Sequence, residues 1–192
     1  MGGVDKGLQL FNGAPLVLHA LQRLSPQVGH ILINANRNVE RYRAFDVPVF
    51  ADGLADFAGP LAGFLVGLQH CETPYLLTVP CDTPLFPADL ASRLVEGLQA
   101  EGADMAIAWA PEANDDGSET LRPQPVFCLM RANLRENLVQ FTEAGGRKVG
   151  AWIDMHKTAL VPFDHKDDSP DAFLNANTLA ELRALEQQRA AP

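Results

Sequence analysis

The sequence predicts a three-layer α/β domain with a mostly parallel sheet and helices on both faces. Short apolar runs that suit buried strands alternate with longer stretches whose apolar residues recur at helical spacing. The strand-like runs lie at residues 30–33, 47–51, 75–79, 105–109, 126–130 and 159–163. Because polar side chains directly follow several of these runs, the sequence also predicts a ligand site at the carboxyl edge of the sheet.

The helices are predicted from apolar stripes that each occupy one helical face. These stripes are Leu16, Val17, Ala20, Leu21 and Leu24; Leu61, Phe64, Leu65 and Leu68; Leu90, Leu94 and Leu98; Leu134, Leu138 and Phe141; and Leu179, Leu182 and Leu185. A proline stands near the start of each of the first three helices, where its fixed φ is favourable. Thr178 and Glu181 have capping-box spacing before the last helix. The polar run at 114–119 is predicted to be a solvent loop.

Composition indicates one folded domain spanning residues 1–192. Hydrophobic residues make up 47% of the chain, which excludes a disordered protein. The net charge of −9 argues against a nucleic-acid-binding surface, and no apolar run approaches the length of a membrane span. Cys71, Cys81 and Cys128 lack metal-ligand spacing, which favours reduced thiols and a cytoplasmic protein. Cys81 is interpreted as a small buried hydrophobe rather than a nucleophile.

The run Tyr75–Val79 reads as a buried interior strand that delivers a carboxylate to the ligand edge. It is largely apolar, and Pro80 marks its end because proline cannot donate to a sheet ladder. Asp82 then stands just beyond the carboxyl end of the strand. We therefore expect Asp82 to hold a divalent metal ion.

Three further segments carry candidate ligand-binding residues. Residues 1–7 read Met-Gly-Gly-Val-Asp-Lys-Gly, in which glycines allow close approach of backbone amides to phosphate and Lys6 supplies charge. A flexible terminus is the alternative interpretation of this segment. Asn34 and Asn36 follow one predicted strand, where two asparagines either contact a base or ribose edge or close a turn, and Asp52 follows the next predicted strand. Arg147 and Lys148 form the densest pair of positive charges in the second half of the chain.

Taken as an ordered set, these segments resemble the molybdenum cofactor guanylyltransferases over nearly the whole chain. The matching segments are 1–7 (MGGVDKG), 34–37 (NANR), 59–63 (GPLAG), 80–84 (PCDTP) and 175–178 (NANT). The resemblance implies a Rossmann-like nucleotidyltransferase fold with GTP and Mg²⁺ as ligands. It also implies transfer of GMP to molybdenum-molybdopterin, which gives molybdopterin guanine dinucleotide and pyrophosphate.

The resemblance also implies roles for individual residues. Lys6 is similar to the phosphate-binding lysine of the family, Asn34 and Asp52 to its guanine-nucleotide contacts, and Asp82 to its magnesium ligand. Residues on the pterin side are less well defined, and the candidates are Arg147, Lys148, Asn175 and Asn177. Molybdoenzyme apoproteins or their chaperones are the protein partners that such an enzyme would serve.

Two alternatives to this function remain open. One is another nucleotidyltransferase, which uses CTP on the same pterin or a nucleotide on a sugar phosphate. The other is a non-catalytic protein that binds nucleotide or molybdopterin and passes the cofactor to an apoenzyme.

The family pattern normally begins with a strand and a Leu-Ala-Gly-Gly-x-x-x-Arg loop directly before the Met-Gly-Gly segment. That strand and loop are both missing from this sequence, so we expect Met1 to be an internal methionine of a longer protein. An inner strand that is missing from a parallel sheet leaves two rows of backbone groups unpaired. The genomic sequence upstream of Met1 tests this expectation, which an in-frame stop codon directly before Met1 would contradict.

Overall fold

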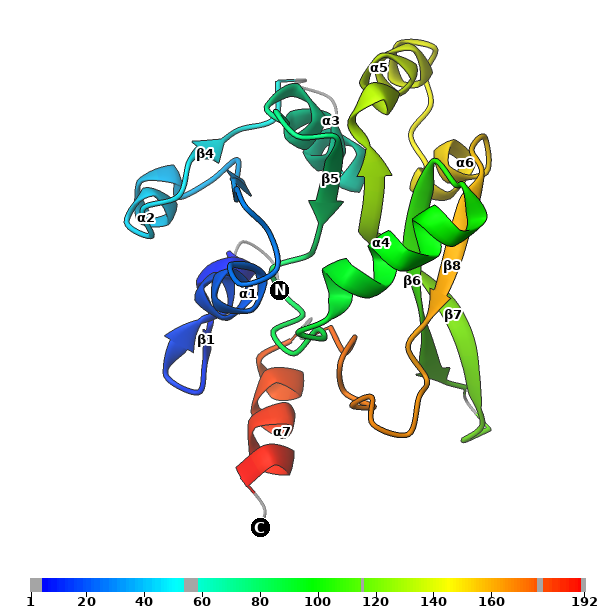
Figure 1. Cartoon of the computed structure of the whole chain (residues 1–192). Coiled ribbons are helices and arrows are strands. Elements are labelled where there is room, and N and C mark those ends of the chain that lie inside the picture. The colour runs from blue at the N-terminus through cyan, green and yellow to red at the C-terminus, as the bar shows by residue number, and fades with distance from the viewer. Residues whose placement is uncertain (1–4, 54–58, 115, 176–177, 191–192) are drawn as a thin grey trace.

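The computed structural model describes residues 5–53, 59–114, 116–175 and 178–190 (Figure 1). A four-stranded sheet forms the middle layer, and helices form a layer on each of its faces. A smaller lobe lies beside the β5 edge of this sheet (Figure 1). The strands are β1 (Leu10–Phe11), β2 (Ala14–Pro15), β3 (Ile33–Asn34), β4 (Val49–Phe50), β5 (Tyr75–Thr78), β6 (Met105–Ala113), β7 (Glu119–Arg131) and β8 (Thr158–Pro162). The helices are η1 (Lys6–Leu8), α1 (Leu16–Leu24), α2 (Val39–Arg43), α3 (Pro60–Gln69), α4 (Leu90–Glu101), η2 (Ala132–Leu134), α5 (Arg135–Glu143), α6 (Val149–Ile153) and α7 (Leu179–Ala190). Among the residues described here, no helix has both the length and the apolarity needed to cross a bilayer.

The main sheet is mixed, whereas the sequence predicts a mostly parallel one. Its strand order is β5-β7-β6-β8, and β7 runs antiparallel to both of its neighbours. Among the described strands of this sheet, β6 and β8 are the only neighbours that pair in parallel. The difference arises because β6 and β7 are the two arms of one long hairpin rather than strands joined by a helical crossover.

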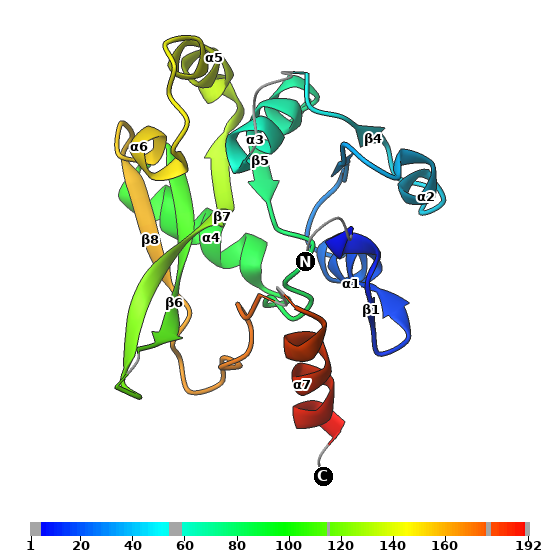
Figure 2. The ribbon, with the colours of Figure 1, turned by 180° about the vertical axis from the view of Figure 1, so that it is seen from behind.

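This hairpin also extends beyond the predicted strands. Residues 119–124 pair with residues 108–113 of β6, and the ladder shifts register between Ile107 and Ala108, so that residues 125–127 have no register partner in β6. The two-stranded end projects away from the helices (Figure 2). Pro123 and Pro125 are tolerated there because, in this part of β7, the strand edge that faces away from β6 has no ladder partner among the described strands.

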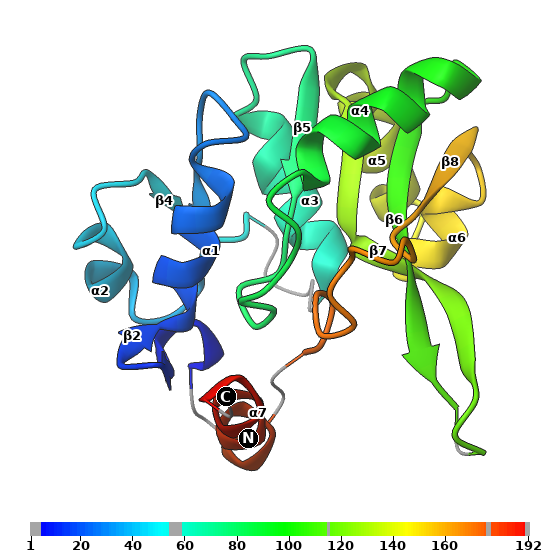
Figure 3. The same cartoon turned by 60° about the horizontal axis from the view of Figure 1, so that its bottom comes forward.

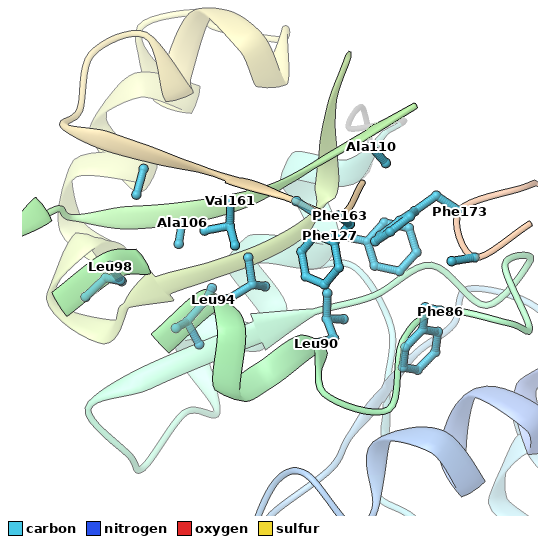
Figure 4. Close-up of a cluster of buried hydrophobic side chains, with 14 of the residues drawn as sticks. Phe86, Leu90, Leu94, Leu98, Ala106, Ala110, Phe127, Val161, Phe163 and Phe173 are labelled. Carbon is cyan, nitrogen blue, oxygen red and sulfur yellow. The ribbon is translucent and has the colours of Figure 1, made fainter. Parts of the chain in front are cut away.

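Helices cover both faces of the main sheet, as the sequence predicts. On one face, α4 presents Leu90, Leu94 and Leu98, each 0% exposed, to Phe127 of β7 and Val161 of β8 (Figure 4). On the other face α3, α5 and α6 enclose a second core that includes Phe64, Leu138 and Trp152. The helix α4 ends at Gly102, whose φ of 58° suits a glycine C-cap.

The smaller lobe combines a parallel pair of short strands with α1 and α2. β3 pairs with β4 in the register Ile33↔Val49 and Asn34↔Phe50. Leu8, Val17, Ile33 and Tyr42 form its core. The predicted strands at 30–33 and 47–51 are therefore shorter in the structure, because the described ladder between them has only two residue pairs.

The helix α7 lies at the bottom of the molecule in the view of Figure 1, and Figure 3 brings this side forward. Leu182 and Leu185 pack with Phe11, Leu16 and Leu85 in a separate apolar cluster. The predicted capping box is confirmed, because the backbone N–H of Glu181 donates to Thr178 Oγ1 (3.1 Å) and that of Thr178 donates to Glu181 Oε2 (3.0 Å).

Candidate active site

The centre of the site is an ion pair between two residues that the sequence analysis selected separately. Asp82 follows β5, and its Oδ2 lies 3.0 Å from Nζ of Lys6 in η1. The Asp82 side chain is 17% exposed and the Lys6 side chain 38% exposed. Both side chains are therefore partly accessible to solvent.

The loop that carries Lys6 is anchored to α2 through Asp5. The carboxylate of Asp5 accepts hydrogen bonds from the hydroxyl of Tyr42 and from Nδ2 of Asn38 (2.9 Å). Burial, together with the hydrogen bond to Asp5, raises the pKa of Tyr42 above its ordinary value. The tyrosine hydroxyl therefore stays protonated and remains a donor throughout the physiological pH range.

Gly7 lets this loop lie close to its neighbours. A Cβ at this position would lie 2.5 Å from the Tyr42 hydroxyl oxygen and 3.2 Å from Cys81 Sγ. No side chain fits there without displacing one of those groups. The glycine is thus required by close approach, which fixes the position of the neighbouring Lys6.

The structure agrees with the interpretation of Cys81 as an unreactive thiol. Burial raises the pKa of Cys81 to about 12, and the negative charges of Asp82 and Asp5 add to this effect. A thiol with this pKa is almost entirely protonated at neutral pH, and the thiol form is a poor nucleophile. Its role beside Asp82 is packing against Gly7.

Asn34 and Asp52 meet at the carboxyl ends of β3 and β4. Nδ2 of Asn34 donates to Oδ1 of Asp52 (2.9 Å) and to the carbonyl of Phe50 (3.2 Å). Asn36, the second asparagine at the carboxyl end of β3, donates from Nδ2 to Oδ2 of Asp52 (2.6 Å). The structure thus makes a second polar cluster from one carboxylate and two amides.

One cavity of about 1080 Å³ connects the two clusters. Asn34 and Asp82 both line this cavity, and so does Gly63 of α3. Asn175 also lines the cavity, and Thr83, which is fully buried, donates its hydroxyl proton to Asn175 Oδ1. Asn34, Asp82 and Asn175 therefore line the same cavity, and Lys6 and Asp52 are bonded to two of these lining residues.

The remaining predicted residues do not join this group. Arg147 lies in the turn after α5, where its Nη1 donates to the carbonyls of Thr142 and Gly146. Lys148 directly precedes α6. Both stand between α5 and α6, and neither lines the cavity. Asn177 lies outside the described residues.

The sequence analysis did not identify two residues that hold the candidate ligand contacts in place. These residues are Asp5 and Tyr42, which anchor the Lys6 loop. The Asn-x-Asn spacing directly after a strand indicated Asn36, although not its contact with Asp52. The sequence contains no comparable signal for Asp5 and Tyr42, which are 37 positions apart.

The fold and this arrangement of a lysine, a carboxylate and polar strand ends define the class of α/β nucleotidyltransferases. Solved structures show the same fold. A molybdopterin-guanine dinucleotide biosynthesis protein A from Archaeoglobus fulgidus superposes with a TM-score of 0.77 at 18% identity, covering 99% of this chain and 93% of that one. A 2-C-methyl-D-erythritol 4-phosphate cytidylyltransferase from Thermus thermophilus gives a TM-score of 0.71 at 13% identity, with 97% and 94% covered.

Sequence comparisons identify the family within this class. Residues 1–159 match the MobA-like NTP transferase domain. The molybdenum cofactor guanylyltransferase of Acidovorax sp. (strain JS42) is 65% identical over 97% of this chain and 89% of the relative. That of Albidiferax ferrireducens is 62% identical over 99% and 91%. The chain belongs to the molybdenum cofactor guanylyltransferase family.

Proposed function

We infer that this protein transfers GMP from GTP to molybdenum-molybdopterin, making molybdopterin guanine dinucleotide and releasing pyrophosphate. The observation that carries this inference is the identity of 65% and 62% to relatives named molybdenum cofactor guanylyltransferase over nearly the whole chain. The site chemistry agrees with it. The attacking group is a phosphate oxygen, so the reaction needs positioning and charge neutralisation rather than an activated nucleophilic side chain. The protonated thiol of Cys81 fits this requirement.

Lys6 is proposed to bind the phosphates of GTP. Its ammonium already lies in an ion pair at the edge of the cavity, and η1 is held by the contacts of Asp5 with α2. A cation that is fixed before the reaction stabilises the charge that develops on the leaving pyrophosphate. Its contribution should therefore be larger in the transition state than in the ground state.

Asp82 is proposed to be the protein ligand of a Mg²⁺ ion. Within the described part of the chain, no group of three or more histidine, cysteine or acidic side chains could hold a metal ion. A single carboxylate fits Mg²⁺, which is commonly bound by one or two carboxylates together with water and substrate phosphates. When bound, the ion would neutralise phosphate charge. We therefore expect the metal to bind together with GTP rather than before it.

Asn34 and Asp52 are proposed to contact the guanine nucleotide. Asn34 lines the cavity, and its Oδ1 faces Gly63 of α3, where an added Cβ would lie 3.2 Å away. Both amide protons of Asn34 have acceptors in the protein, so its oxygen is the atom best placed to serve a ligand. The carboxylate of Asp52 adds negative charge that suits the N–H groups of guanine.

On the pterin side, Asn175 is the candidate with structural support, because it lines the cavity and contacts the residue after Asp82. Arg147, Lys148 and Asn177 remain proposals from the sequence. Molybdoenzyme apoproteins or their chaperones are the proposed recipients of the product. The three free cysteines suit the reducing cytoplasm in which we propose that the enzyme acts.

Nucleotide turnover separates this function from its alternatives. We expect pyrophosphate release with GTP, Mg²⁺ and molybdenum-molybdopterin, and at most about 1% of that rate with CTP or ATP, as hydrogen-bonded base recognition allows. Preference for CTP would instead indicate a cytidylyltransferase. Calorimetric binding of GTP without pyrophosphate release would indicate a non-catalytic carrier.

We also propose that an additional strand completes the sheet between β3 and β5. The sequence predicts β5 as a buried interior strand, yet all four of its residues are only half-buried, because β5 pairs with β7 alone among the described strands. Its other edge faces the large cavity, which β3 and α1 line from the opposite side. Among the described strands, β3 pairs with β4 alone and β5 with β7 alone, so each has an open edge, and an inserted strand would occupy the part of the cavity between them.

Hydrogen exchange tests this proposal. In the chain of residues 1–192, we expect the β5 amides that point away from β7 to exchange as fast as loop amides, because no described group accepts from them. Fusing a strand-forming segment of about six residues ahead of Met1 should slow exchange in both β3 and β5 and raise the Tm. Slow exchange at those amides in the unfused chain, or no change on fusion, would contradict the proposal.

A further inference from the structure

Asn36 holds Asp52 at two points. Its Oδ1 accepts a hydrogen bond from the backbone N–H of Asp52 (2.7 Å), and its Nδ2 donates to Oδ2 of the same residue (2.6 Å). Asn34 donates from Nδ2 to the other carboxylate oxygen (2.9 Å). Each oxygen of the Asp52 carboxylate therefore has one amide donor, and the two donors come from the same loop.

This loop is a firm support for the carboxylate. Asn34 is paired with Phe50 in the β3–β4 ladder, and the backbone N–H of Ala35 continues the ladder by donating to the carbonyl of Phe50 (2.9 Å). The terminal torsion of an aspartate is otherwise broad, particularly on a half-exposed rim. Two donors on opposite oxygens fix the plane of the group and the direction of its remaining lone pairs.

The negative charge of Asp52 is not neutralised by a basic side chain among the described residues. Among the residues that the structure describes, its side-chain partners are neutral amides, and no lysine or arginine forms an ion pair with it. A carboxylate has about four acceptor positions. With one position per oxygen occupied, one remains on each oxygen for two adjacent donors.

Guanine offers such a pair of donors on one edge, the N1–H and the 2-amino group. Cytosine and adenine do not present two neighbouring N–H donors on that edge in their usual tautomers. A carboxylate with a fixed plane recognises this pair, whereas a freely rotating one loses part of the geometric selectivity. The orientation of Asp52 is thus the property that separates guanine from the other bases.

We propose that Asn36 is a positioning residue that sets base specificity by orienting the carboxylate of Asp52. The proposal rests on the proposed function, since it takes GTP to be the nucleotide and Asp52 to be its base contact. Asn36 acts through Asp52 in this assignment.

Steady-state kinetics with GTP and inosine triphosphate test the proposal, because inosine triphosphate lacks only the 2-amino group. In Asn36→Ala we expect the KM for GTP to rise about 10-fold, the loss of one charge-assisted hydrogen bond, while the KM for inosine triphosphate changes less than about 3-fold. The kcat at saturating nucleotide and the Tm should stay near the wild-type values. The preference for GTP over inosine triphosphate therefore shrinks.

Asn36→Asp distinguishes orientation from simple support of the loop. This variant keeps an oxygen that can accept from the backbone N–H of Asp52 but replaces the amide donor with a second negative charge. We expect it to raise the KM for GTP more than Asn36→Ala does. Asn133→Ala is the matched control, because Asn133 is exposed on η2 and has no hydrogen bond among the described residues.

Wild-type behaviour of Asn36→Asp would overturn the proposal, as would equal changes in KM for both nucleotides or a loss confined to the Tm. Failure of the proposed function gives a different result. In that case the wild-type enzyme itself releases no pyrophosphate from GTP. The effect of Asn36 is then read from the dissociation constants of the two nucleotides, and equal constants in wild type and Asn36→Ala would reject it.

Discussion

Replacing Asp82 with asparagine is expected to lower kcat for GMP transfer by about 10²–10³-fold, the usual loss when one preorganised electrostatic group is removed from an active site. The change keeps the size and shape of the side chain but removes the charge that pairs with Lys6 and is proposed to hold Mg²⁺. The ion pair is partly exposed, so its loss should change the free energy of unfolding by no more than about 1 kcal/mol. Pyrophosphate release at saturating GTP and Mg²⁺, measured beside the Tm, checks both expectations.

Asp154→Asn is the control for this substitution. Asp154 is an exposed acid just after α6 and does not line the cavity. Its replacement by asparagine changes the net charge of the protein by the same amount as Asp82→Asn. The kcat of this variant should equal that of the wild type. Turnover of Asp82→Asn within about 3-fold of the wild-type value, well short of the loss expected for a metal ligand, would remove Asp82 from the catalytic machinery.

The second large effect is expected from Gly7→Ala. The added methyl would lie 2.5 Å from the Tyr42 hydroxyl oxygen, which cannot move freely because it donates to Asp5 and its ring is buried. Overpacking of this kind costs about 1–3 kcal/mol of stability. Because the loop carries Lys6, the kcat for GMP transfer should fall about 10-fold as the ammonium is displaced from the phosphate position. Thermal unfolding and pyrophosphate release at saturating GTP measure the two effects.

A second substitution shows whether the clash is the cause. Tyr42→Phe removes the oxygen that meets the new methyl, so the double variant Gly7→Ala/Tyr42→Phe should be more stable than the sum of the two single effects predicts. Gly29→Ala is the control, because no atom lies within 4 Å of a Cβ built at Gly29. Strict additivity of Gly7→Ala and Tyr42→Phe would show that the contact with Tyr42 does not determine the position of the loop.

Much of the fold follows from local sequence signals. The buried face of α4, the capping box of α7 and the strand that leads to Asp82 all depend on residues within a few positions of one another. Periodicity and capping act over that range, so one sequence is enough to predict them. The apolar character of β5 predicts a buried interior strand, whereas among the described strands β5 lies at an edge of the main sheet and is half-buried.

The arrangement of the main sheet could not be predicted in the same way. Alternating strands and helices suggested parallel pairing, but a polar segment with prolines forms the outer arm of a hairpin and places β7 between β5 and β6. Proline content and polarity are poor guides to strand pairing where one edge of a strand is open. The length of the ladder between β3 and β4, which has two residue pairs, likewise depends on how the strands pair and cannot be predicted from their composition.

The sequence by itself determined the α/β class, the family resemblance and the candidates Lys6, Asn34, Asp52 and Asp82. It could not determine which of these touch. Lys6 and Asp82 are 76 positions apart, and Thr83 and Asn175 are 92 apart, so only chain folding brings them together. The tertiary structure also determined which residues hold these candidates in place. Tyr42 donates a hydrogen bond to Asp5 in the loop that carries Lys6, and Asn36 donates one to Asp52. Hydrogen bonds and ion pairs act over about 3 Å, and the sequence does not encode such separations directly.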